Sequence, residues 1–306
     1  MIQENTNAVK AAPPVTKKKS QKKWKEYLSG YLFILPNLAL IAVFLIYPLF
    51  ETFRLSFYDA DIQGETFVGL QNYITIFSDP IFINSIKNTF YFVLIVVPAV
   101  VIVSFTLAAM MRDLRQSSKS IFRIIFYLPV ISTPVVMTMI WSWIYNTNYG
   151  ILNYFRSLFG YAPTEIMGTP TSAIIALSVV VATWSIGQPI ILYLASMDGI
   201  PKDYYEAADI DGASPLRKFF NITLPLVGHT TLFVTITTTI ATFQIFVVIY
   251  LLTGGGPYFA TETLVFTIYR TAFTSYEFGK ASAQGVVLFV IIAIIALVQL
   301  RLLRSK

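Results

Sequence analysis

The chain has 306 residues, of which 56% are hydrophobic and only 12% are charged. A soluble domain has about 25% charged residues, so this composition indicates a membrane protein. The formal net charge is +6, but the basic residues flank apolar segments, which favours a role in membrane orientation over nucleic-acid binding. The sequence contains no cysteine, which excludes disulfides, thiolate metal sites and cysteine nucleophiles.

Residues 1–30 form a basic, lysine-rich tail that we expect to lie in the cytoplasm. No small-residue cleavage site follows the first apolar run, so we interpret that run as an uncleaved membrane helix rather than a signal peptide. We expect the lysines to set orientation rather than to bind a specific lipid. The transmembrane domain then covers residues 31–303.

Apolar runs of about 18 residues or more predict an all-α membrane protein with six transmembrane helices. We place these spans at residues 31–53, 88–111, 122–145, 172–197, 226–252 and 281–303. Lys and Arg are enriched in cytoplasmic segments. Placing both termini in the cytoplasm puts seventeen of the 22 Lys and Arg residues on that side. We therefore predict a multi-pass protein with cytoplasmic termini.

Residues 198–225 form the longest polar stretch in the second half of the chain, and they predict two short helices joined by a turn. Pro201 suits the first position of the first helix. Asp203 and Glu206 would then lie near its positive end, where carboxylates are favoured. Gly212 is placed to end this helix in a left-handed cap.

The second short helix of this stretch is predicted from Ser214 and Pro215, a capping residue and a first helical residue. Pro225 is expected to break the chain before the next apolar run. Residues 198–221 contain five acidic and three basic residues. An acidic loop on the side where positive charge is expected predicts a partner surface that carries Arg or Lys.

The same stretch contains a spaced motif: Glu206-Ala207-Ala208, three residues, Gly212, nine residues, then Ile222-x-Leu224-Pro225. It resembles the EAA loop of binding-protein-dependent ABC importers, in particular carbohydrate permeases of the maltose and glycerol-phosphate type. Weaker similarities to these permeases extend the resemblance over roughly residues 30–303. They are Val68-Gly69-Leu70-Gln71-Asn72-Tyr73, Phe77-Ser78-Asp79-Pro80, Asn88-Thr89-Phe90, Gly150-Ile151-Leu152-Asn153 and Leu251-Leu252-Thr253-Gly254-Gly255-Gly256-Pro257.

The resemblance implies a type I-like ABC importer permease fold with a cytoplasmic coupling helix, in a bacterial plasma (inner) membrane. It implies that coupling to an ATPase depends on Glu206, Ala207, Ala208, Asp211 and Gly212. It also implies three kinds of partner: a second homologous permease subunit, two ATPase subunits and an extracytoplasmic solute-binding protein. ATP and Mg would be bound by the ATPase, because this sequence has no G-x-x-x-x-G-K-[ST] motif. We expect no cofactor and no catalytic residue in this chain.

We find no Asp, Glu, Lys or Arg in the middle of a predicted span, and such groups mark proton relays. This weakens a proton-coupled mechanism, although sodium coupling through carbonyls and hydroxyls stays open. A stand-alone secondary transporter of a neutral polar solute is therefore the alternative function. An intramembrane enzyme lacks a nucleophile–base pair and metal ligands, and we interpret the single histidine, His229, as a packing or interfacial residue.

Neutral polar and aromatic side chains remain in the fourth and fifth spans. Amides bind hydroxyl groups and aromatic rings stack on the C–H faces of sugars, which suits an uncharged polyhydroxy solute. Because corresponding regions of the family line the substrate path, we predict that path from Trp184, Gly187, Gln188, Tyr193 and Gln244. Helix packing is the alternative for these residues. On one face of the fifth span we favour hydrogen bonds to the helix backbone for Thr231, Thr235, Thr238 and Thr242.

Overall fold

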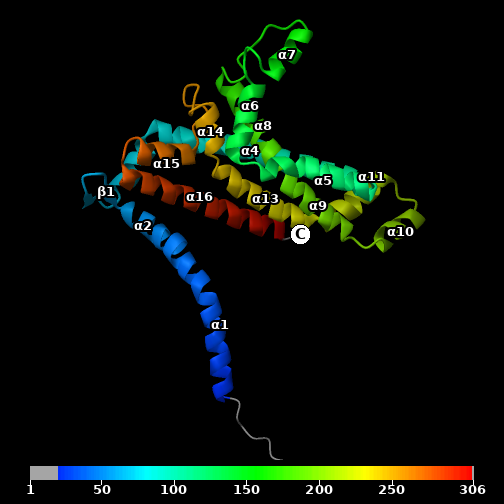
Figure 1. The fold of residues 1–306 in the computed structure, drawn as a ribbon, viewed down its shortest axis with the longest axis horizontal. Helices are drawn as coiled ribbons and strands as arrows, with labels where there is room; N and C mark the ends of the chain where they lie inside the picture. The colour runs from blue at the N-terminus through cyan, green and yellow to red at the C-terminus, as the bar shows by residue number, and fades with distance from the viewer. Residues whose placement is uncertain (1–19, 305–306) are drawn as a thin grey trace, which may run out of the picture. The chain divides into compact units, whose positions relative to one another are not determined.

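The computed structural model describes residues 20–304, and most of them are helical (Figure 1). The chain divides into two compact units, residues 1–51 and 52–306. The first contains α1 (Ser20–Ile41), the π-helical segment η1 (Ala42–Ile46) and the start of α2 (Tyr47–Leu55). These helices run on from one another and include the first predicted span. The tail lysines before residue 20 lie outside the described residues.

The second unit contains a short β-hairpin and the remaining helices. The hairpin pairs β1 (Tyr58–Ala60) antiparallel with β2 (Glu65–Phe67), with Tyr58 opposite Phe67. The helical segments are α3 (Gln71–Ser78), α4 (Pro80–Arg112), α5 (Gln116–Ile131), α6 (Pro134–Ile144), α7 (Ile151–Leu158), α8 (Pro170–Ser185), α9 (Gly187–Asp198), α10 (Asp203–Ile210), α11 (Pro215–Lys218), η2 (Phe219–Thr223), α12 (Leu224–Leu226), α13 (Gly228–Phe243), α14 (Val247–Leu252), α15 (Leu264–Phe273) and α16 (Phe278–Arg304).

Helix α4 has 33 residues and is the centre of the second unit. It packs against α8, α9, α13 and α15, and its buried face includes Phe92, Val96 and Val100. The Asp79 side chain accepts a hydrogen bond from the Ile81 N–H, which begins the helix eight residues before the predicted start. The prediction followed the apolar run, whereas the capping residue decides where the helix begins.

Two of the predicted spans are bent pairs of helices, and a third bent pair begins in the stretch predicted as the coupling loop. The span predicted at 122–145 is α5 and α6, which meet at 101°, and the span predicted at 172–197 is α8 and α9, which meet at 47°. The segment α11–α12 meets α13 at 63°. Among the described residues, three single helices are long and apolar enough to cross a membrane, and up to six spans result if each bent pair crosses once.

The break between α5 and α6 has a local cause. Thr133 caps α6 by accepting from the Val136 N–H, and Pro134 occupies the first turn, so a new helix begins inside the apolar run. The span predicted at 226–252 is also interrupted, because α13 ends at Phe243 and α14 begins at Val247. Pro225 does not break the chain as expected. The helical segment continues to Leu226 and the bend follows at Val227.

Candidate functional site

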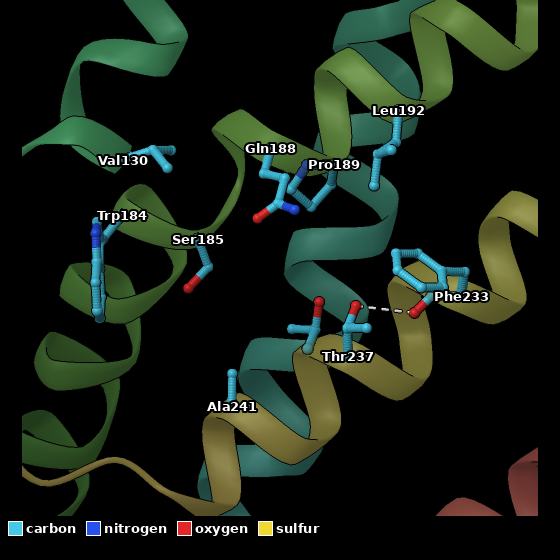
Figure 2. Close-up of a pocket in the computed structure, with 10 residues that line it drawn as sticks. Val130, Trp184, Ser185, Gln188, Pro189, Leu192, Phe233, Thr237 and Ala241 are labelled. Carbon is cyan, nitrogen blue, oxygen red and sulfur yellow. Dashed lines mark hydrogen bonds between the residues drawn. The ribbon is translucent and has the colours of Figure 1, made fainter. Parts of the chain in front are cut away.

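Polar side chains face α13 from the junction between α8 and α9. Helix α8 ends at Ser185, and α9 begins two residues later after the 47° bend. Pro189 has no N–H to donate to the preceding turn, which loosens the helix at this point. Figure 2 shows Ser185 and Gln188 pointing into the space between this junction and α13.

Gly187 serves a different surface from the one expected. A Cβ atom added here would overlap the carbonyl oxygen of Phe126 and lie 2.6 Å from Val130 Cγ2. Glycine therefore allows α9 to pack closely on α5. The space beside Gly187 is filled by α5, and Gly187 lines neither of the two cavities described next.

Two adjoining cavities lie along the junction. One has a volume of about 260 Å³, the other a volume of about 340 Å³, and both are lined by Trp184, Ser185 and Ala241. The first is also lined by Val130, Gln188, Pro189, Leu192, Phe233, Thr237 and Thr238. The second is also lined by Pro134, Val181, Thr242, Gln244, Ile245, Phe246, Val247 and Val248. None of these lining residues is charged.

The two glutamine amides of the cavities are available to a solute. Gln188 and Gln244 are exposed, and within residues 20–304 neither side chain has a protein hydrogen-bond partner. Thr237 differs, because its hydroxyl donates 2.8 Å to the carbonyl of Phe233 (Figure 2). An amide supplies both donors and an acceptor, so these two residues can bind sugar hydroxyl groups.

Threonines of α13 donate hydrogen bonds to the backbone of their own helix, as predicted. Thr231, Thr235 and Thr242 donate to the carbonyls of Val227, Thr231 and Thr238, at 3.2, 2.7 and 2.8 Å. The backbone hydrogen bonds predicted for these three residues are therefore confirmed. Thr238 and Thr242 still line the cavities.

Tyr193 lies away from both cavities. Its side chain is fully buried, and its ring packs edge-on against Phe105 at 5.3 Å. The residues that our sequence reasoning missed are Ser185, Phe233 and Thr237. Ser185 is next to Trp184, and Thr237 is one position from the predicted stripe, so sequence neighbourhood alone pointed close to both.

The acidic stretch folds largely as predicted. Helix α10 begins at Asp203 after Lys202, so Pro201 precedes the helix and its predicted place in the first position is wrong. Asp203 and Glu206 do lie in the first turn, where the helix dipole favours carboxylates.

Gly212 ends α10 in a left-handed conformation with φ of +67°. The Ala213 N–H donates to the Ala208 carbonyl at 2.9 Å, and the Gly212 N–H donates to the Asp209 carbonyl at 3.1 Å. These two bonds form a Schellman motif. Ser214 then caps α11 by accepting from the Arg217 N–H, so both predicted caps are confirmed.

The outer face of α10 is open to a partner. Glu206, Ala207, Asp211 and Gly212 are exposed, and Ala208 is partly so. Ile210 is 88% exposed. The carboxylates, the two alanines and Ile210 are therefore accessible to a partner surface.

Tyr205 connects the inner face of α10 to the membrane helices. Its hydroxyl lies 2.9 Å from the Thr223 hydroxyl in η2, and the Arg112 guanidinium at the end of α4 lies 4.2 Å from its ring centroid. A cavity of about 520 Å³ opens beside these groups, with Glu206 in its lining. Sequence reasoning missed Tyr205, because nothing in the sequence distinguishes it from the adjacent Tyr204.

Asp198, at the end of α9, ties that helix to α5. Its two carboxylate oxygens lie 3.6 Å from Lys119 Nζ and 3.7 Å from Arg123 Nη2. These two ion pairs connect the end of α9 to α5 close to α10. We predict that this end of the α8–α9 pair faces the cytoplasm.

The comparisons with known proteins agree with this architecture. The family described as "Binding-protein-dependent transport system inner membrane component" matches residues 100–305. The "sn-glycerol-3-phosphate transport system permease protein UgpA" of Yersinia enterocolitica is 33% identical over 280 residues, covering 90% of this chain and 94% of the relative. The "Probable ABC transporter permease protein YurN" of Bacillus subtilis is 32% identical, covering 90% and 96%.

Two solved structures of a bacterial alginate ABC transporter share the fold. A chain of the transporter "involved in the import of the acidic polysaccharide alginate" has a TM-score of 0.81 and 22% identity, covering 93% of this chain and 98% of that one. A chain from the complex with an "alginate pentasaccharide-bound periplasmic protein" has a TM-score of 0.83 and 22% identity, covering 93% and 96%. The resemblance inferred from the EAA spacing is confirmed. This chain belongs to the inner membrane components of binding-protein-dependent transport systems and has the permease fold of type I ABC importers.

Proposed function

We propose that this chain is one permease subunit of an ATP-driven importer that moves an uncharged sugar or oligosaccharide. The observation that carries the substrate class is the pair of adjoining cavities at the α8–α9 junction. They combine two unpartnered amides, the indole of Trp184 and several hydroxyls, and their lining has no charged side chain. Amides would bind the hydroxyls of the solute, and the indole would cover its C–H face.

Two of the named relatives handle anionic compounds, which makes the neutral lining informative. One relative is a sn-glycerol-3-phosphate permease, and the alginate transporter imports an acidic polysaccharide. An anion that leaves water needs a paired cation or several strong donors. The cavities of this chain offer amides and hydroxyls instead, which supports a neutral solute.

The energy for transport would come from a partner. The outer face of α10 suits an ATPase surface that carries Arg or Lys. The ATPase subunit itself would bind ATP and Mg. Closure of an ATPase dimer would move α10. Tyr205 would pass this movement to α4 through Arg112 and to η2 through Thr223, and so alter the α8–α9 junction. A second permease subunit would complete the path, and a solute-binding protein would deliver the sugar.

This assembly also sets the orientation that we propose. Helix α10 and both termini would face the cytoplasm, in agreement with the distribution of Lys and Arg. The connection between α14 and α15 would then face the opposite side.

The first experiment identifies the solute by mass spectrometry of the compound retained by the co-purified solute-binding protein. Uptake of that compound is then measured in liposomes that contain the full complex, with Gln188→Leu or Gln244→Leu. Each variant removes hydrogen bonds to an uncharged group, so half-maximal uptake should need roughly threefold to tenfold more solute.

Thr235→Val is the matched control, because its hydroxyl donates to the backbone of α13 and it lines neither cavity. Its uptake should equal that of the wild type. Unchanged uptake in both glutamine variants would mean that Gln188 and Gln244 serve in helix packing and do not bind the solute. Transport by this chain without any partner would contradict the importer itself and favour a secondary transporter.

A further inference from the structure

The connection between α14 and α15, residues 253–263, is held in one conformation by distant parts of the chain. We name it the Tyr258 loop. Asn84 and Asn88 of α4 both donate to the carbonyl oxygen of Phe259, at 3.1 and 2.9 Å. Asn88 also donates to the carbonyl of Glu262 at 3.0 Å. The loop is therefore fastened to the N-terminal end of α4 and cannot move independently of it.

A buried ion pair fixes the base of the loop. Glu262 is fully buried, and its two carboxylate oxygens lie 2.7 Å from Arg270 Nη2 and 3.1 Å from Arg270 Nη1. The Thr267 hydroxyl donates to the same carboxylate at 3.1 Å. This two-pronged arrangement is a geometrically specific form of the Arg–carboxylate pair. Breaking a buried pair leaves a charge without its partner, which is costly, so the pair holds Glu262 at the base of the loop against Arg270 of α15.

The top of the loop is strained. Tyr258 and Phe259 have φ of +52° and +59°, and non-glycine residues adopt such angles only where the surrounding structure holds them there. The ring of Phe259 is covered by the Arg270 guanidinium, 5.5 Å from the centroid. Tyr258 has no such cover and is 89% exposed. The fold thus holds a bare tyrosine ring outward on a rigid support.

The Tyr258 loop and α10 lie at opposite ends of α4 (Figure 1). Asn88 contacts the loop, and Arg112 contacts Tyr205 of α10. The helix between Asn88 and Arg112 is roughly 36 Å long at 1.5 Å per residue. That length exceeds the hydrocarbon thickness of a bilayer, about 30 Å. With α10 facing the ATPase, the loop therefore faces the side from which solute arrives.

We propose that Tyr258 is a docking residue for the solute-binding protein. This inference rests on the proposed function, and the alginate transporter chain of the same fold comes from a complex with a periplasmic protein. A rigid, exposed tyrosine offers a large contact area with little entropy to lose on binding, and such residues dominate protein interfaces. The alternative is that the ring of Tyr258 lies among the lipid headgroups. That position would need neither the strained backbone nor the buried ion pair.

The test is Tyr258→Gly in the full complex, reconstituted in nanodiscs. Glycine removes the ring and relieves the strain at positive φ, so the variant should melt at the wild-type temperature or above it. Its affinity for the solute-binding protein should fall about tenfold or more, the effect of truncating an interface hot spot. The matched control is Tyr276→Gly, because Tyr276 has φ of +60° and is 50% exposed. The control should bind with wild-type affinity.

The outcomes separate the two proposals. Wild-type complex that does not bind the solute-binding protein would contradict the proposed function. Wild-type complex that binds, with Tyr258→Gly binding equally well, would overturn the docking inference alone, as would equal losses in the two variants.

The lipid alternative has its own measurement. Because this chain has no cysteine, Tyr258→Cys offers one thiol for a nitroxide label. A label that is accessible to a water-soluble nickel chelate, and is immobilised when the solute-binding protein is added, supports docking. A label reached by oxygen and protected from the chelate would place residue 258 in lipid and overturn the proposal.

Discussion

Gly187→Ala tests whether the bend beside Gln188 depends on close packing between α5 and α9. The added methyl group would overlap the carbonyl oxygen of Phe126 and lie 2.6 Å from Val130 Cγ2. Ordinary contact begins at 3.4 Å, so Val130 must give way by 0.8 Å. The Val130 side chain can rotate, but the Phe126 carbonyl belongs to the backbone of α5. The two helices must therefore move apart.

The expected cost follows from two opposing effects. Overpacking a well-packed site costs about 1–3 kcal/mol, whereas replacing glycine by alanine inside a helix gains about 0.5–1 kcal/mol. The overlap involves backbone that cannot rotate away, so overpacking outweighs the gain. We expect a net destabilisation of about 1–2 kcal/mol, together with a displaced Gln188 and slower uptake.

Thermal unfolding of the purified complex and solute uptake in liposomes measure the two effects. Gly285→Ala is the control, because a Cβ atom there would meet its nearest neighbour, Thr52 Cγ2, at 3.8 Å. That variant should be as stable as the wild type or slightly more stable. If Gly187→Ala melted at or above the wild-type temperature and transported normally, the close-packing explanation of Gly187 would be wrong.

Three other predictions concern the α10 surface and the buried carboxylate. Glu206→Ala should weaken co-purification of the ATPase by about 2–5 kcal/mol, because a docked cation desolvates this carboxylate. Asp203→Asn in the same turn should cost only about 0–1 kcal/mol of ATPase binding. A larger loss for Asp203→Asn than for Glu206→Ala would show that the docking contact is at Asp203. Tyr205→Phe removes the hydroxyl that contacts Thr223, so ATP hydrolysis stimulated by the solute-binding protein should fall while the subunits still co-purify. Unchanged stimulation would remove Tyr205 from the coupling route. Burial raises the pKa of Glu262, more than Arg270 and Thr267 lower it, so the folded chain holds the carboxyl proton more tightly than the unfolded chain does. That contribution to stability is present at low pH and is lost as pH rises through the raised pKa. The melting temperature of the wild type should therefore fall relative to that of Glu262→Gln as pH rises. A constant difference between the two melting temperatures across the pH range would contradict this prediction.

The sequence alone determined the features that depend on a few neighbouring residues. The left-handed cap at Gly212 needs only the preceding turn of helix and a residue without Cβ strain, and both are visible in the sequence. The cap at Ser214 is equally local. The helical class and the family also followed from the sequence, because long apolar runs have one solution in lipid and the EAA spacing is specific. Gln188 and Gln244 were predicted in the path because corresponding regions of the family line it, and both residues line cavities.

Tertiary structure decided the features that depend on which helices meet. A straight membrane helix and a bent pair of helices have the same apolar pattern, so hydropathy did not predict the 101° bend between α5 and α6. Thr133 and Pro134 are the local sequence features at this bend. Gln188 and Tyr193 lie on one helix, yet one is exposed in a cavity and the other is fully buried. Lipid and protein interior are both apolar, so hydropathy cannot assign a helix face to either. Only the packing of α5, α4 and α13 around α9 sends Tyr193 into the core and Gln188 into the cavity.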